Sequence, residues 1–415
     1  MISSESSDEE LFQPAANVAT AAAARKPKRV QPKPLVSAPA LPPSSDEVTS
    51  QKRRAETAVE SVSTDPEMAQ RLKREARKKR KVEEKEARAA EKQQQQKDQL
   101  DTERAVKGRA FTLSLAIPGS ILDNAQTKEL KTYVAGQVAR AAVIFQVDEI
   151  VVFDDQLGTK GRTTGVPVPR SHDCHVFMAR ILQYLETPQY LRRALFPMHS
   201  DLSCAGLLNP LDCPHHLRAQ EWSVYREGVV TDRPLKEKEG SHVYVGLQRE
   251  VVVDKRVKPG IRVTVKIDEA SKEFKKKMTG RLVSSAEPRE QLGVYWGYTT
   301  RFASSLSNVW TDCPFPGGYD LKVGTSERGN VSVDDADFAL PKFRHALIVF
   351  GGVAGIEECV DADEKIPLTG ADSSTLFDMW VNTCPDQGSR TIRLEEALLV
   401  SLAAFRPHVA RGGRA

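Results

Sequence analysis

FDMWVNTCPDQGSRTIRLEEALLVSLAAF, residues 377–405, joins an apolar run to a helical pattern through a stiff loop. Phe377 to Val381 form a short apolar run that is typical of a buried strand. Leu398, Leu402 and Phe405 recur at helical spacing, and Thr391 is the expected cap of that helix. The loop between the two elements is rich in Pro, Gly, hydroxyl and amide side chains. The stretch therefore predicts a strand–loop–helix unit of an α/β sheet.

The same alternation occupies residues 108–214. AFTLSLAIPGSIL (110–122) and VDEIVVFD (147–154) indicate buried strands, and KELKTYVAGQVARAAVIF (128–145) indicates an amphipathic helix. CHVFMARILQYLETPQYLRRALF (174–196) is a further helical pattern, which Pro188 should kink or divide. Alternating strands and helices predict an α/β domain built on a parallel sheet. Residues 283–410 resume this pattern and form its second part.

Residues 215–282 interrupt the alternation with short strands. EWSVYREGVV, SHVYVGLQREVVVD and IRVTVKID are separated by turn residues, which predicts a small OB-like β-barrel. Trp222, Tyr225 and Tyr244 are interleaved with basic residues, a combination suited to single-stranded RNA. A solvated barrel surface with Trp222 in its core is the alternative. The basic residues are Lys255, Arg256, Lys258, Arg262, Lys266, Lys272, Lys275, Lys276, Lys277 and Arg281.

Composition limits the class of protein. Residues 1–107 carry 22 Lys and Arg against 18 Asp and Glu, which leaves 38 of each among the remaining residues. The body is thus neutral, and contacts with nucleic acid require local patches. Residues 1–107 are predicted to be a disordered and charged helical arm. Residues 71–81 resemble a nuclear address or an RNA-contacting segment, and a solvated charge run is the alternative. Six scattered cysteines without a C-x-x-C pair indicate reduced thiols, and no apolar run is long enough for a membrane span.

Three segments share one pattern, an apolar strand followed by a loop of small residues. They are residues 324–329, residues 351–355 and residues 382–391. In open parallel sheets, ligands bind where such loops converge at the carboxyl ends of the strands. The loops match neither G-x-G-x-x-G nor the P-loop, and G-x-S-x-G is absent. The pattern therefore predicts a nucleotide-like ligand without identifying it.

A zinc site is the competing interpretation of residues 199–216. The potential ligands have no C-x-x-C spacing, and Pro214 crowds the last of them, so a structural turn is preferred and no metal is predicted. These ligands are His199, Cys204, Cys213, His215 and His216.

Taken together, the segments resemble the SPOUT-class (trefoil-knot) RNA methyltransferases, especially eukaryotic members and their archaeal relatives. The resemblance covers roughly residues 109–406 and is most specific in CPFPGGYDLKVGTSERG, FRHALIVFGG and NTCPDQGSRTIRLEEA. The other matching stretches are FTLSLAIPGSILDNAQ, VDEIVVFD, HSDLSCAGLLNPLDCPHHLR and YWGYTTRFASSL. The resemblance implies a deep trefoil knot with an OB-like insertion in the methyltransferase domain.

The resemblance also implies that the three loops bind S-adenosyl-L-methionine. Asn382 and Arg328 would hold the ribose or the carboxylate, while backbone groups of the loops read the adenine edge. The full implied set is Arg328, Gly352, Gly355, Asn382, Thr383, Gln387, Gly388, Thr391 and Ile392. Ordinary turns are the alternative interpretation of the glycines.

The implied reaction is methylation of a uridine base at N3 in large-subunit ribosomal RNA. Because neutral uracil carries a proton on N3, the site needs a base, and Asp123 and Glu327 are the candidate carboxylates. Arg301 and Arg328 are candidates for stabilising an oxygen anion. Surface solvation or helix capping is the alternative for the carboxylates.

The predicted partners are RNA and a second copy of the chain, with no membrane. The homodimer follows by analogy, because the cofactor pocket of this fold class usually lies at a dimer interface. The predicted location is the nucleus or nucleolus, extending to the cytoplasm and mitotic spindle. The alternative function is a non-catalytic RNA-binding or spindle- or kinetochore-associated scaffold that retains the fold.

Overall fold

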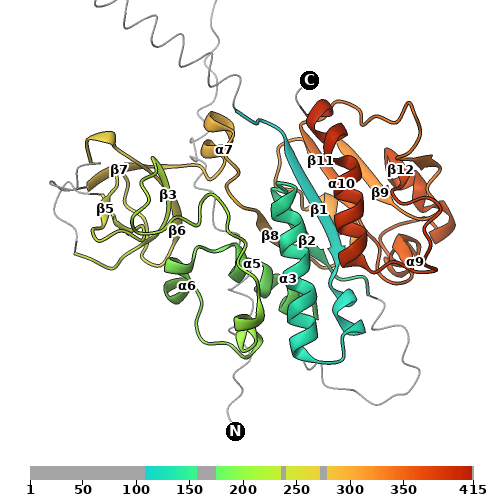
Figure 1. Ribbon diagram of the computed structural model, residues 1–415, viewed down its shortest axis with the longest axis horizontal. Helices are drawn as coiled ribbons and strands as arrows, with labels where there is room; N and C mark the ends of the chain where they lie inside the picture. The colour runs from blue at the N-terminus through green and yellow to red at the C-terminus, as the bar shows by residue number, and fades with distance from the viewer. Residues whose placement is uncertain (1–107, 157–173, 235–239, 272–277, 414–415) are drawn as a thin grey trace, which may run out of the picture. The chain divides into compact units, whose positions relative to one another are not determined.

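The computed structural model describes residues 108–156, 174–234, 240–271 and 278–413 (Figure 1). The charged N-terminal arm lies outside these residues, as do Lys272, Lys275, Lys276 and Lys277 of the predicted basic groove.

A seven-stranded sheet forms the centre of the α/β domain. Its order is β10-β12-β9-β11-β1-β2-β8, and every neighbouring pair is parallel (Figure 1). This confirms the predicted parallel sheet. The strands are β1 (Thr112–Pro118), β2 (Glu149–Phe153), β8 (Thr299–Ala303), β9 (Leu321–Thr325), β10 (Val331–Ser332), β11 (His345–Val349) and β12 (Met379–Asn382).

Helices cover both faces of the sheet, which explains the nearly continuous apolar composition of its strands. In β2, Ile150 and Val152 pack with α3, α5 and α10, whereas Val151 and Phe153 pack with α8 and α9 on the other face. Pro188 divides the helical stretch after residue 174, as predicted. The helices are α3 (Lys128–Ile144), α5 (Cys174–Glu186), α6 (Gln189–Leu195), α7 (Glu287–Leu292), α8 (Leu306–Thr311), α9 (Gly355–Ala362) and α10 (Leu394–Gly412). None of the described helices has the length and apolar character of a membrane span.

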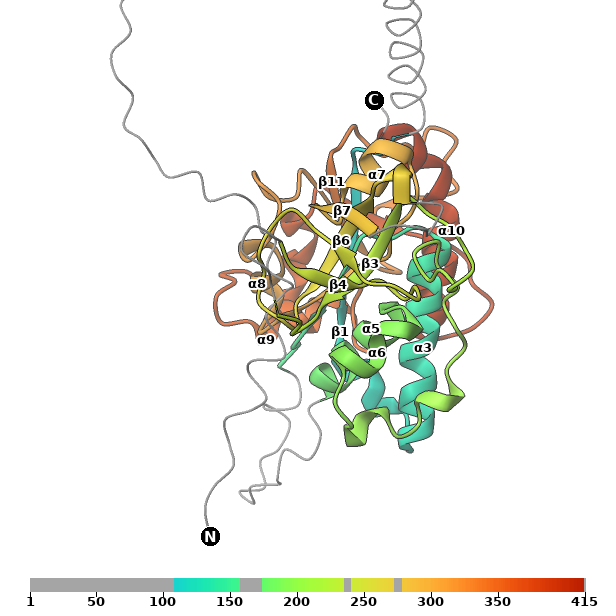
Figure 2. The ribbon, with the colours of Figure 1, turned by 90° about the vertical axis from the view of Figure 1, so that its left-hand side faces the viewer.

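A closed five-stranded barrel is inserted between α6 and α7, and Figure 2 shows its strands. The order is β3-β4-β5-β7-β6, and the barrel has an apolar core of its own that includes Val243, Val251 and Val265. This confirms the predicted barrel. The strands are β3 (Tyr225–Val230), β4 (His242–Tyr244), β5 (Val251–Val252), β6 (Arg262–Ile267) and β7 (Met278–Val283).

Arg262 joins the barrel to the α/β domain through buried charges. From β6, its guanidinium lies 2.5 Å from Glu186 at the end of α5 and 2.7 Å from Glu227 of β3. Trp296 also donates to the Glu227 carboxylate, at 2.7 Å. Both carboxylates are almost fully buried. Arg262 is therefore a structural residue of this junction, and its predicted place in a basic RNA groove is wrong.

Candidate functional site

The three predicted loops lie together at one edge of the sheet. They follow β9, β11 and β12, and these strands are neighbours in the order β12-β9-β11. Because all three strands are parallel, their carboxyl ends lie on the same side. The predicted convergence is thus present in the structure.

The loop after β9 crosses the end of β12 to reach β10, since β12 lies between those two strands. The Ser326 amide donates to the carbonyl of Val381 at 3.1 Å, and Asn382 donates from its side chain to the carbonyl of Glu327 at 3.0 Å. At Gly329 the two backbones are so close that a Cβ would lie 2.1 Å from the Asn382 nitrogen. Glycine is therefore required where this loop passes over β12.

The glycine turn after β11 is equally tight. A Cβ at Gly351 would lie 2.3 Å from the carbonyl carbon of Gly355, whose φ of +87° favours glycine. Gly355 begins α9, and Glu357 in its first turn accepts a 3.3 Å hydrogen bond from the Ser326 hydroxyl. This bond ties the glycine turn to the loop after β9.

The loop after β12 is held where it leaves the strand. The Asn382 side chain accepts from the Cys384 amide at 3.1 Å, and the Thr383 hydroxyl lies 2.6 Å from that of Ser401 in α10. Asn382 is thus bonded to two of the three loops. Of the other predicted residues in this loop, Gln387 is half-buried, whereas Gly388, Thr391 and Ile392 are exposed.

Arg393, rather than Thr391, occupies the N-cap position of α10. Its amide donates to the Glu396 carboxylate at 3.0 Å in a capping box. The Thr391 amide instead faces the Ser389 hydroxyl at 3.4 Å, within the loop. The predicted cap at Thr391 is therefore wrong by two positions, because the loop extends further before the helix begins.

The predicted catalytic residues do not share one place. Arg301 donates to Glu149, the first residue of β2, at 3.1 Å, and to the Tyr319 hydroxyl just before β9 at 3.2 Å. This buried group lies toward the amino ends of the strands, opposite the three loops. Within this chain, Arg301 is therefore a structural residue, and its predicted role in stabilising an anion is not supported.

The two predicted carboxylates are solvated. Asp123 is 61% exposed and pairs with Lys131 at 3.1 Å. Glu327 is exposed, as is Arg328 beside it, and the loop uses the Glu327 carbonyl in its hydrogen bond with Asn382. Glu327 and Arg328 thus lie at the edge formed by the three loops, whereas Asp123 lies on the surface in the segment after β1, the neighbour of β11.

A second polar group lies beside the glycine turn and was not predicted. Ser120, after β1, donates a hydrogen bond to the carboxylate of Asp155, after β2. A Cβ at Gly352 would lie 3.6 Å from the Asp155 carboxylate and equally far from the Ser120 hydroxyl. Burial raises the pKa of Asp155, against the opposing effects of Ser120 and His175. The sequence signal was the position of Asp154-Asp155 directly after a buried strand, where the carboxyl end of a parallel strand is expected.

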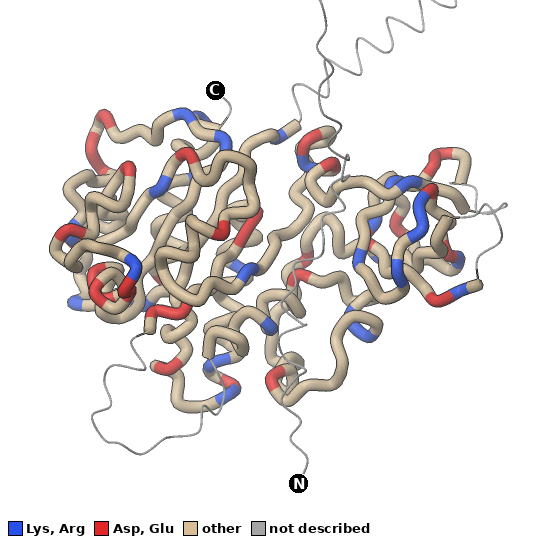
Figure 3. Tube along the Cα trace, turned by 180° about the vertical axis from the view of Figure 1, so that it is seen from behind, with Lys and Arg blue, Asp and Glu red and all other residues tan. Residues whose placement is uncertain are grey.

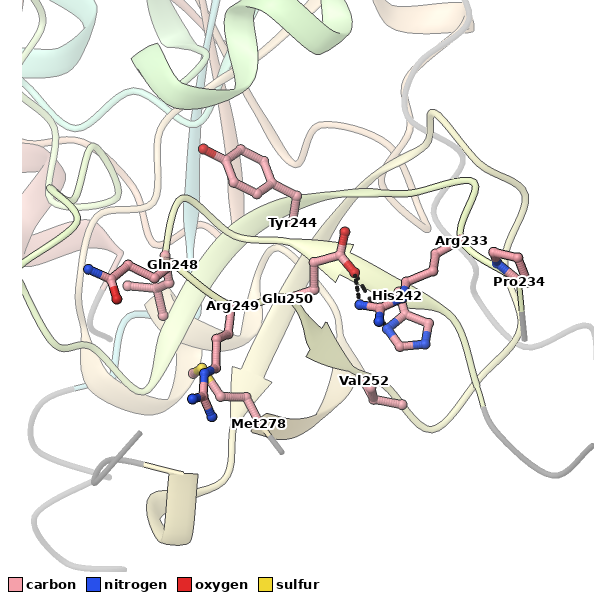
Figure 4. A pocket seen from close by; sticks show the side chains of 10 residues that line it. Arg233, Pro234, His242, Tyr244, Gln248, Arg249, Glu250, Val252 and Met278 are labelled. Carbon is pink, nitrogen blue, oxygen red and sulfur yellow. Dashed lines mark hydrogen bonds and ion pairs between the residues drawn. The ribbon is translucent and has the colours of Figure 1, made fainter. Parts of the chain in front are cut away.

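The barrel carries a hollow of about 810 Å³, lined by Arg233, Tyr244, Arg249 and Glu250 among others (Figure 4). Glu250 pairs with Arg233 at 3.1 Å and approaches His242 at 3.6 Å, so an acidic group occupies its wall. The hollow belongs to the barrel and does not include any of the three loops.

The basic residues of the barrel divide into two groups. Lys266 pairs with Glu287 at 3.2 Å and lies over the ring of Tyr225, which is itself buried. Tyr225 is thus no stacking surface for a base. By contrast, Lys255, Arg256 and Lys258 are exposed on the turn between β5 and β6. Figure 3 shows basic and acidic stretches alternating over the barrel.

Three of the five potential zinc ligands lie close together. Cys213, His215 and His216 come together, but the Nε2 atoms of both imidazoles lie within 3.0 Å of the Glu186 carbonyl. Burial lowers the pKa of His216 to about 4 and raises the pKa of the Cys213 thiol to about 12. These hydrogen bonds hold the two imidazoles against the carbonyl of Glu186, at the end of α5.

Known proteins are similar to this chain over most of its length. It is 54% identical to the human 28S rRNA (uridine-N(3))-methyltransferase, over 76% of this chain and 84% of that protein. It is 29% identical to an uncharacterised protein of Halobacterium salinarum, over 71% of this chain and 99% of that one. A solved SpoU methyltransferase, AviRb from Streptomyces viridochromogenes in complex with AdoMet, overlaps 31% of this chain and 43% of its own, with 20% identity and a TM-score of 0.19. The family described as "Putative RNA methyltransferase" matches residues 112–405. The chain therefore belongs to this putative RNA methyltransferase family.

Proposed function

We propose that this chain is an S-adenosylmethionine-dependent RNA methyltransferase that modifies N3 of a uridine in large-subunit ribosomal RNA. The observation that carries the proposal is the linked set of three loops at one edge of the sheet, tied by Asn382 and Glu357. The substrate is inferred from the 54% identity with a relative whose name specifies that reaction.

The residues of this edge fit a nucleotide-like methyl donor. The tight turn between Gly351 and Gly355 has no side chain at either glycine, so a ligand can approach the main chain closely there. Gly352, Gly355, Asn382 and Thr383 would form the inner wall, with Arg328 at the rim. Gln387, Gly388, Thr391 and Ile392 would complete the wall from the last loop. The bound donor would supply an electrophilic methyl group.

The proposal includes the SPOUT class and its trefoil knot. The support is topological, because β12 enters the sheet between β9 and β10, which the chain has already joined by the loop of residues 326–330. A strand inserted beneath an earlier connection is the arrangement that a threaded chain requires.

The proposal also includes a homodimer and a nuclear or nucleolar location. Leu399 and Val400 on α10 are 41% and 38% exposed, near the loop after β12, and would be covered by a second copy. Sedimentation equilibrium tests the dimer, with a single monomeric species as the contrary result.

The proposed nuclear or nucleolar location follows from the substrate, because large-subunit ribosomal RNA is assembled in the nucleolus. Fluorescence of the tagged chain in cells tests this location.

Nucleoside mass spectrometry tests the reaction itself. Purified protein, S-adenosylmethionine and unmodified large-subunit ribosomal RNA should yield 3-methyluridine, whereas an Asn382→Ala variant should yield little. Asn382 makes two hydrogen bonds of about 1 kcal/mol each, so its loss should weaken cofactor binding at least 10-fold in calorimetry. Tight RNA binding without any cofactor binding would instead favour the scaffold, including one associated with the spindle or kinetochore.

The barrel is proposed as the RNA-binding element, with the exposed turn between β5 and β6 as its basic contact. The variant Lys255→Glu/Arg256→Glu/Lys258→Glu should bind RNA more weakly, and its affinity should depend less steeply on salt. For single-stranded RNA, three lost phosphate contacts reduce the slope of log affinity against log salt by about 2. Filter binding across a salt series measures it.

The matched control is Lys342→Glu/Arg344→Glu, which reverses two exposed charges before β11, in the α/β domain. This control should leave the slope near that of the unmodified protein. Equal slopes for the barrel variant and the unmodified protein would remove the barrel turn from the RNA-binding surface.

A further inference from the structure

The edge of the sheet that holds the three loops continues across β1 and β2. In the order β12-β9-β11-β1-β2, the loops after β1 and β2 come directly beside the glycine turn after β11. The part of this edge formed by the loops after β9, β11 and β12 contains glycines, amides and exposed charges. The neighbouring half offers the buried Ser120–Asp155 pair. An acceptor base placed beside the cofactor would face this pair.

The pair has the properties of a proton relay. Asp155 is 2% exposed, and its carboxylate accepts a hydrogen bond from the Ser120 hydroxyl, while Ser120 itself is only half-buried. The hydroxyl is therefore the accessible end and the carboxylate the buried end. Gly352 of the glycine turn lies beside the pair, because a Cβ at this position would be in van der Waals contact with both groups, at 3.6 Å.

Other titratable groups lie near Asp155, but none of those described below is as well placed to accept the proton. His175 of α5 is 3.4 Å from the neighbouring Asp154, and Cys359 of α9 donates to the carbonyl of Gly355 at 3.5 Å. Burial raises the pKa of the Cys359 thiol to about 12, which keeps it protonated. Asp154 is 40% exposed and accepts from the amide of Gln156 at 2.8 Å. Among these groups, Asp155 combines burial, a hydroxyl partner and contact with the glycine turn.

We propose that Ser120 and Asp155 remove the N3 proton of the acceptor uridine, an assignment that rests on the proposed function. The N3 proton passes to the Ser120 oxygen while the hydroxyl proton of Ser120 passes to the Asp155 carboxylate. The N3 lone pair forms the new bond to the methyl carbon. The carbon–sulfur bond of the donor breaks, and its electron pair stays on sulfur. Charge and atoms balance without a further reactant.

The raised pKa of Asp155 is consistent with this role, because a more basic carboxylate accepts a proton more readily. The role of Asp155 as a base also sets how the rate of methyl transfer depends on pH. The ionised carboxylate is the active form, so the rate should rise as pH increases through the pKa of Asp155 and then level off.

The test compares Asp155→Asn and Ser120→Ala with Asp154→Asn, the same chemical change one residue away. Methyl transfer to ribosomal RNA transcripts should fall between about 100- and 10,000-fold in Asp155→Asn. Ser120→Ala should also be slow, whereas Asp154→Asn should stay within a few-fold of the unmodified protein. In Asp155→Asn the rate should keep rising with pH, because only uridine ionised by solvent can then react.

Transcripts that contain 5-fluorouridine separate proton removal from a structural effect. Fluorine makes the N3 proton more acidic, so the defect of Asp155→Asn should shrink at least 10-fold on this RNA. Calorimetry should show unchanged S-adenosylmethionine affinity, and thermal unfolding an unchanged midpoint. An equal defect on both transcripts, or an unaltered pH profile, overturns the assignment. If the unmodified protein binds the cofactor but produces no 3-methyluridine, the proposed function fails, and this inference fails with it.

Discussion

Gly329→Ala should lose most of its S-adenosylmethionine binding and methyl transfer while the protein remains folded. The added methyl group would lie 2.1 Å from the backbone nitrogen of Asn382 and 2.4 Å from the carbonyl carbon of Val381. Neither atom belongs to a flexible side chain, so the loop after β9 must lift away from β12. The 3.0 Å hydrogen bond from Asn382 to the Glu327 carbonyl should then break.

The expected loss of methyl transfer follows from the displacement of the loop after β9. A displacement of about 1 Å in residues that position reacting groups costs roughly 100-fold in rate. Calorimetry with S-adenosylmethionine and single-turnover methyl transfer measure the two effects separately. The loop is at the surface, so the midpoint of thermal unfolding should fall by only a few degrees.

Gly206→Ala is the matched control. Gly206 lies in a short helical turn away from the site, and a Cβ there would meet nothing within 4 Å. The control should bind the cofactor like the unmodified protein. Normal cofactor affinity in Gly329→Ala would mean that the crossing over β12 does not form the pocket, and the site would have to be sought elsewhere.

The three loops could be predicted because their signals are local. A buried apolar run followed by small residues identifies the carboxyl end of a strand, and parallel strands place such ends on one side. The sequence could not show that β12 lies between β9 and β10, because strand order depends on long-range pairing. It also left Asp155 unnoticed, although Asp154-Asp155 follows a buried strand in the same way.

Two of the predictions that failed depended on where a long side chain points. Arg301 and Arg262 both lie on strands, and from the sequence both side chains were expected to be accessible. In the structure, each guanidinium pairs with a buried carboxylate from a distant segment. Glu149 is separated from Arg301, and Glu186 from Arg262, by long stretches of chain. Charge counts along the sequence cannot distinguish a solvated arginine from one that neutralises a buried carboxylate.

Arg262→Met should produce the largest loss of stability of the substitutions considered. It removes the cation but leaves Glu186 and Glu227 buried, and breaking a buried pair in this way costs about 3–5 kcal/mol. Arg233→Met is the control, because Arg233 is 62% exposed in its pair with Glu250, and such surface pairs contribute at most about 1 kcal/mol. Urea unfolding at neutral pH measures both free energies.

The pH dependence identifies the cause of the loss. Burial alone would raise the pKa of Glu186, but the charge of Arg262 and hydrogen bonds from His215 and Arg262 hold it well below 4.5. The stabilisation is therefore present above about pH 4.5 and falls as the pH decreases below it. In Arg262→Met only burial and the weaker His215 contact remain, so the pKa of Glu186 should rise and protonation should relieve the buried charge. The stability difference between the two proteins should be largest near pH 7 and narrow toward pH 4.

A second substitution separates the charge from the packing of the arginine side chain. Adding Glu186→Gln to Arg262→Met removes one of the two stranded carboxylates, so the double variant should recover part of the lost free energy at pH 7. If the buried charge is the cause, recovery should be accompanied by loss of the pH dependence. If the double variant is less stable than Arg262→Met at every pH, the arginine acts through its packing and its neutral hydrogen bonds. The junction between barrel and sheet would then not depend on buried charge.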